Sequence, residues 1–79
     1  MTISGFAFKP ATINVPVGTT VVWVNEDAAA HIVADKAGKF RSKSLAKGDK
    51  FSEKFTQAGT VEYFCAIHAS MTGKIVVGP

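Results

Sequence analysis

The stretch Tyr63–Met71 concentrates side chains that bind metal ions. Cys65 is the only cysteine in the chain, and His68 and Met71 follow it at intervals of three residues. A single loop can therefore turn a thiolate, an imidazole and a thioether toward one point. His31 is the only other histidine, so it would have to supply a second imidazole. Such a donor set suits a trigonal copper site used for electron transfer. We therefore predict His31, Cys65, His68 and Met71 as ligands of one metal ion.

The rest of the chain predicts an all-β fold. No stretch has sustained helical periodicity, and short apolar runs are separated by Gly, Pro and Asn. The run Thr19–Asn25 is apolar on both faces and predicts a central strand between two layers. With the shorter runs, seven or eight strands fit a Greek-key β-sandwich. The other expected extended segments are Thr2–Lys9, Ile13–Val17, Ile32–Ala34, Lys50–Thr56, Thr60–Cys65 and Gly73–Val77.

Several side-chain orientations follow from this assignment. Phe6 and Phe8 should share one face of the first strand, and Ile13, Val15 and Val17 one face of the second. Pro16 cannot donate to a central ladder, so it predicts an edge position or a bulge. Glu53 falls on the same face as Phe51 and Phe55, and access to water at a sheet edge would accommodate its charge.

Length and composition set further bounds. A chain of 79 residues predicts one domain, residues 1–79, and we expect a monomer. So short a chain buries roughly 60% of its extended-chain surface, and a metal that ties distant segments together would add stability. No apolar run reaches the length of a membrane span, and no signal peptide is present. The chain therefore reads as a mature form, an excised domain or an engineered protein.

The net charge of +3 is unevenly distributed, because seven of the nine basic residues fall between Lys36 and Lys54. The favoured interpretation is a solvated segment. The alternative is an electropositive patch that steers an acidic partner. A nucleic-acid partner does not fit, because the segment has neither a recognition-helix pattern nor interleaved aromatic residues.

Two features of the chain resemble the cupredoxins, the small blue (type 1) copper proteins. One is the Cys65-x-x-His68-x-x-Met71 run, and the other is His31, which follows a strand with the pattern Val-x-Trp-x-Asn. The resemblance extends from Ile3 to Val77, and the loop is most similar to those of amicyanin and plastocyanin. It implies one mononuclear type 1 copper ion, a periplasmic or other extracytoplasmic location, and a non-enzymatic electron carrier that meets larger redox proteins briefly.

The resemblance also implies a role for each histidine. His31 would coordinate through Nδ1 and lie deeper than His68, whose exposed edge would pass electrons to a partner. A patch of small apolar residues would surround that edge. Its candidate members are Ala28, Ala29, Ala30, Ala66, Ile67 and Ala69.

This sequence departs from the family pattern beside the ligands. Ile32 stands where the family usually has Asn, and Ala66 where it has Ser or Thr, so the usual side-chain link between the two loops is missing. The backbone N–H of Ile32 can still donate to the Cys65 sulfur. Ile67 stands where Pro is common, and we hypothesise that its N–H makes a second bond to that sulfur.

Other functions compete with electron transfer. A copper storage protein would be richer in Met and Cys, and a Cys–His hydrolase would need an orienting Asp or Asn and an oxyanion hole. A non-metal, immunoglobulin-like interaction module explains the strands but not the Cys-His-Met spacing. A copper-binding module, or a minimal or engineered cupredoxin core, remains an alternative, and zinc could occupy the same ligands.

Overall fold

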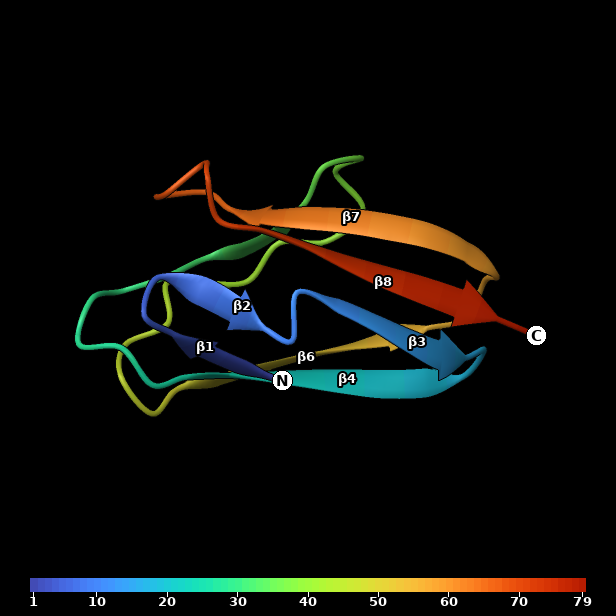
Figure 1. Ribbon diagram of the computed structural model, residues 1–79, viewed down its shortest axis with the longest axis horizontal. Helices are drawn as coiled ribbons and strands as arrows, with labels where there is room; N and C mark the ends of the chain where they lie inside the picture. The colour runs from blue at the N-terminus through green and yellow to red at the C-terminus, as the bar shows by residue number, and fades with distance from the viewer.

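The computed structural model describes all residues, 1–79, as eight strands in two four-stranded sheets packed face to face (Figure 1). No helix long and apolar enough to cross a membrane occurs in it. The two packed sheets confirm the predicted β-sandwich. One sheet has the order β2-β1-β4-β6, made of Ala7–Lys9, Thr2–Ser4, Thr19–Asn25 and Lys50–Phe55. The other has the order β3-β8-β7-β5, made of Thr12–Pro16, Thr72–Gly78, Gly59–Cys65 and Val33–Asp35.

The core lies between the sheets and is built around aromatic rings. Trp23 of β4 is fully buried and lies edge-on to Tyr63 of β7, with ring centroids 5.4 Å apart. Phe51 and Phe55 of β6 pack on the same indole at 5.6 and 6.4 Å. Because β7 ends at Cys65, this packing anchors the strand that carries the predicted thiolate ligand.

The N-terminal segment differs from the prediction. Instead of one strand over Thr2–Lys9, β1 and β2 form a hairpin in which Ser4 pairs with Ala7. Gly5 and Phe6 form its turn with φ angles of 61° and 56°, the left-handed pair that a two-residue hairpin turn needs. Phe8 is buried but Phe6 is 52% exposed, so the prediction that they share a face was wrong. The turn residues are Gly-Phe, so the sequence lacks the Asn-Gly pair that usually indicates a turn of this kind.

Two predictions about β3 and β4 were wrong in part. Pro16 does end an edge strand, as predicted, but Val17 lies in the following turn and is 44% exposed. The bounds of β4 match the prediction, yet Val22 is 41% exposed. Only the inner face of β4, with Val21 and Trp23, is covered.

The C-terminal strands largely follow the prediction. Val61, Tyr63 and Cys65 share the inward face of β7, and Ile75 and Val77 point inward from β8. Glu53 is half-buried in β6, which is the edge strand of its sheet, so water reaches its carboxylate as expected.

Candidate metal centre

His31 is held by a short backbone pairing with Leu45, which lies in a segment where the sequence predicts no strand. Its N–H donates to Leu45 O at 3.1 Å, and the Leu45 N–H donates back to His31 O at 2.8 Å. Both residues are fully buried. The backbone that carries the imidazole is therefore held in place by hydrogen bonds, although His31 lies outside strands β1–β8.

Cys65 and His68 lie on a tight loop that closes on itself. The Cys65 N–H donates to Met71 O at 3.0 Å, the His68 N–H to Cys65 O at 3.2 Å, and the Met71 N–H to His68 O at 2.9 Å. The loop thus begins and ends on the ladder between β7 and β8, where Phe64 pairs with Thr72. It lies at the same end of the sandwich as the loop that leads to His31 (left in Figure 1).

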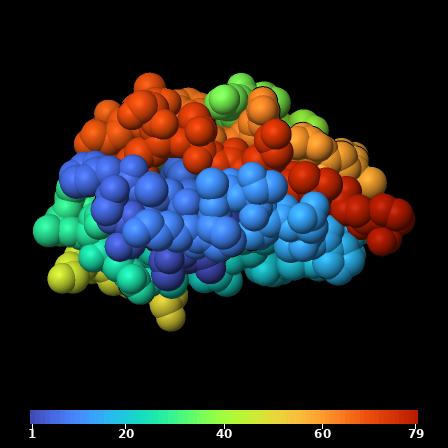
Figure 2. Space-filling model, in the orientation of Figure 1, coloured from blue at the N-terminus to red at the C-terminus, as the bar shows by residue number.

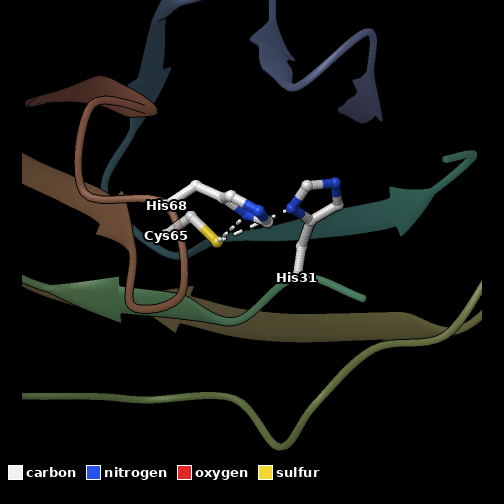
Figure 3. A group of neighbouring side chains, drawn as sticks. All are labelled: His31, Cys65 and His68. Carbon is white, nitrogen blue, oxygen red and sulfur yellow. Dashed lines mark hydrogen bonds between the residues drawn. The ribbon is translucent and has the colours of Figure 1, made fainter. Parts of the chain in front are cut away.

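The three side chains converge on one point, as Figure 3 shows. The Cys65 Sγ atom lies 3.6 Å from Nδ1 of His31 and 3.8 Å from Nδ1 of His68. All three potential ligand atoms lie within 4.8 Å of one another. A trigonal metal with bonds of about 2.0 Å to nitrogen and 2.3 Å to sulfur would separate N and S by roughly 3.7 Å. The donor atoms present therefore fit a single ion bound between them.

Backbone groups link the two loops where the usual side chains are missing. The Ile32 N–H donates to Cys65 Sγ at 3.5 Å, as predicted, and the Ala66 N–H donates to Ile32 O at 3.1 Å. The hypothesised second bond from the Ile67 N–H to the sulfur is not formed, so that prediction was wrong. The sulfur thus has one backbone N–H donor and faces the two imidazoles.

Met71 lies at the far end of the same loop. It is 4% exposed and belongs to the core cluster that also contains Cys65. Its backbone closes the ligand loop through hydrogen bonds with Cys65 and His68, so it lies near these two residues along the chain and in space. Coordination by its thioether stays a prediction.

Sequence reasoning missed Asp27 and Phe6. The Asp27 carboxylate lies 2.9 Å from Nε2 of His31 and also accepts the N–H groups of Gly5, at 2.8 Å, and Phe6, at 2.9 Å. The Phe6 N–H is the largest cause that lowers the pKa of Asp27; partial desolvation opposes it, and Gly5 and His31 lower the pKa further. An acidic residue four positions before His31 was the only local signal of this contact.

The Phe6 ring lies edge-on to both imidazoles, with centroids 5.4 Å from His31 and 5.1 Å from His68. Nothing local in the sequence indicates this position, because it depends on the unexpected hairpin. In Figure 2 the N-terminal segment lies between the orange loop and the green segment at one end of the molecule.

Comparisons with known proteins agree with this geometry. The copper-binding proteins of the plastocyanin/azurin family match residues 1–78. Amicyanin from Paracoccus denitrificans is 35% identical over 80 residues, which cover 95% of this chain and 61% of the relative. The chain therefore spans less than two thirds of that relative's length.

Solved structures give the same result. The reduced Cu(I) form of an amicyanin mutant at pH 4 superposes with a TM-score of 0.92 at 34% identity, covering 98% of this chain and 78% of the other. A copper-containing nitrite reductase from Thermus scotoductus superposes with a TM-score of 0.91 at 31% identity. That match covers 99% of this chain but only 21% of the reductase, so there the fold is one part of a larger chain.

Proposed function

This chain belongs to the plastocyanin/azurin family of copper-binding proteins, and from that premise we propose that it is a blue copper protein that carries single electrons between larger redox proteins. One observation carries the proposal: a thiolate sulfur and two imidazole nitrogens lie at the mutual distances of a trigonal metal site. His31, Cys65 and His68 would hold the copper ion as strong ligands, and the thioether of Met71 would be a weak ligand.

Bound copper would supply reversible one-electron chemistry between Cu(II) and Cu(I). The chain's own contribution is rigidity. His31 and Cys65 are fully buried, and backbone hydrogen bonds hold both the His31 segment and the Cys65–Met71 loop. Because rigid elements hold ligands more precisely than mobile loops, little should move when the charge of the site changes.

His68 is the proposed exit for electrons. It is half-buried, whereas His31 is fully buried, so the His68 ring lies nearer to solvent. Ile67 is 49% exposed and Phe6 is 52% exposed, and both adjoin His68, one in sequence and one in space. A small apolar surface of this kind suits a brief encounter with a redox partner.

The basic segment would act on the approach of that partner. All seven of its Lys and Arg side chains are exposed, and the only ion pair within 4.0 Å in the structure joins His31 and Asp27. Unpaired positive charge steers acidic proteins, so we propose an acidic partner whose association slows as salt is added.

The remaining assignments are part of the same proposal. Residues 1–79 form one domain, supported by a single core cluster between the sheets. The chain works as a monomer, is not itself an enzyme, and acts in the periplasm or another extracytoplasmic space. The similarity to amicyanin supports these assignments.

The test is to add copper(II) to the metal-free protein and to record the visible spectrum and the EPR spectrum. We expect an intense blue thiolate-to-copper band and narrow copper hyperfine splitting, both lost in Cys65→Ser. Ser52→Ala, which removes a hydroxyl from an exposed position on β6, is the control that should stay blue. A pale spectrum with ordinary tetragonal EPR in the unmodified protein would overturn the proposal.

A further inference from the structure

Asp27 is placed by a buried polar anchor that precedes it. Asn25, the last residue of β4, is fully buried, and its Oδ1 accepts the Asp27 N–H at 2.9 Å. Its Nδ2 donates to Ala29 O at 3.0 Å and to Leu45 O at 2.8 Å. The backbone of Asp27 is thus tied, through Asn25, to the same segment that holds His31.

The Asp27 carboxylate fixes the proton of His31. A carboxylate can only accept hydrogen bonds, so the Nε2 atom 2.9 Å away must be the donor. In the neutral ring the other nitrogen, Nδ1, then carries no proton, and Nδ1 is the atom that faces the Cys65 sulfur. Because the ring is fully buried, water cannot supply an alternative partner. The hydrogen bond therefore selects the tautomer that can ligate a metal through Nδ1.

The same carboxylate holds the aromatic cover of the site. Its two oxygens accept the N–H groups of Gly5 and Phe6, both in the left-handed region with φ of 61° and 56°. A Phe in this region is strained, and the two accepted bonds offset that strain. These bonds to Asp27 tie the turn to the His31 segment and thereby hold the Phe6 ring against the His31 and His68 rings.

We propose that Asp27 is a positioning residue of the copper site, which sets the His31 tautomer, holds Phe6 over both imidazoles, and through its negative charge lowers the reduction potential. This inference rests on the proposed function. Its physical basis is that a carboxylate bonded to a ligand imidazole increases the electron donation of that ring and favours the more positive metal state. The side chain is only 14% exposed, so water screens this charge incompletely.

The experiment compares three variants with the unmodified protein. Asp27→Asn keeps an oxygen acceptor of the same shape but removes the charge, whereas Asp27→Ala removes both. Glu26→Gln is the matched control, because it removes one charge from the exposed neighbouring residue. Long-range ¹H–¹⁵N NMR of the metal-free protein reports the His31 tautomer. Spectroelectrochemistry of the copper-loaded protein reports the midpoint potential, and competition with a chelator reports copper affinity.

In the metal-free unmodified protein we expect His31 to be protonated on Nε2 only. In Asp27→Ala we expect mixed tautomers, faster hydrogen exchange at the Phe6 amide, and copper affinity reduced about 10–100-fold. In Asp27→Asn we expect a higher midpoint potential, with Glu26→Gln unchanged.

The inference is overturned if His31 keeps a single Nε2–H tautomer in Asp27→Ala, or if Asp27→Asn and Glu26→Gln have the same potential. Asp27→Asn retains the shape of the side chain, so its midpoint potential tests the effect of the charge even if the alanine variant does not fold. The NMR measurement needs no metal. A missing blue band in the unmodified protein would thus contradict the proposed function, whereas a changed tautomer would still establish the positioning role.

Discussion

At the scale of single residues, Gly73 of β8 lies directly beneath the ring of Tyr63, its register partner on β7. A Cβ atom added at Gly73 would overlap the Cζ, Cε2 and Oη atoms of that ring. Both residues are buried, and the phenol is also confined by Phe8, 4.7 Å away between ring centroids. The glycine is therefore required by side-chain packing, since its φ angle is not in the left-handed region.

Gly73→Ala should lower the free energy of unfolding by about 3 kcal/mol, the upper part of the range for overpacked cores. Gly78→Ala is the matched control, because it lies in the same strand and its added Cβ would meet no atom within 4 Å. Urea denaturation of both metal-free variants measures the difference. Equal unfolding midpoints for the two variants would contradict this account of Gly73.

At the scale of elements, the part of the basic segment that lies between β5 and β6, residues 36–49, is ordered although it contains no strand. Leu45 pairs with His31, Arg41 pairs with Ala34, and the Asp35 N–H donates to Phe40 O at 3.0 Å. The Lys side chains point to water, while the fully buried Leu45 packs in the core. This segment therefore acts as an irregular supporting layer for His31, in addition to carrying charge.

Ser42 is the polar link in that supporting layer. Its Oγ accepts the buried Val33 N–H at 2.9 Å, so Ser42→Ala would leave that group without its partner. We expect a loss of about 1–3 kcal/mol in the free energy of unfolding. Ser44→Ala, at an exposed neighbouring position, should lower the free energy of unfolding much less. Chemical denaturation checks both, and a Ser42 variant as stable as the Ser44 variant would be evidence against the link.

At the scale of the whole molecule, the metal site joins parts of the chain that are far apart in sequence. His31 and Cys65 are 34 residues apart, and the site lies at one end of a particle measuring 36 × 20 × 19 Å. Only 18 of the 79 residues are buried, so the apolar core is small. An ion that binds the folded chain and not the unfolded chain adds directly to its stability.

Copper should therefore raise Tm strongly. Free copper at 1,000 times Kd adds about 4 kcal/mol. For a domain of this size that corresponds to a rise of roughly 15–30 °C. Calorimetry with and without copper measures the shift, and Cys65→Ser should lose most of it. A Tm that does not respond to copper would show that the ligands do not bind the ion in the folded state.

Much of this structure follows from local sequence pattern. Thr19–Asn25 is a strand with the bounds that its apolar run predicts, and β7 and β8 contain the predicted runs Thr60–Cys65 and Gly73–Val77. Cys65 and His68 converge because a spacing of three residues places them on one tight loop. These features depend on contacts within a few residues, so the amino-acid order alone is enough to predict them.

The N-terminal hairpin, the burial of Leu45 and the Asp27 contacts were decided only by the tertiary structure. Asp27 bonds to Gly5 and Phe6, 22 and 21 positions earlier in the chain, and Leu45 pairs with a histidine in another segment. Such contacts leave no periodic signal in sequence, because each depends on how whole strands are brought together. The sequence by itself therefore determined which atoms can bind the metal, and the fold decided which groups orient and cover them.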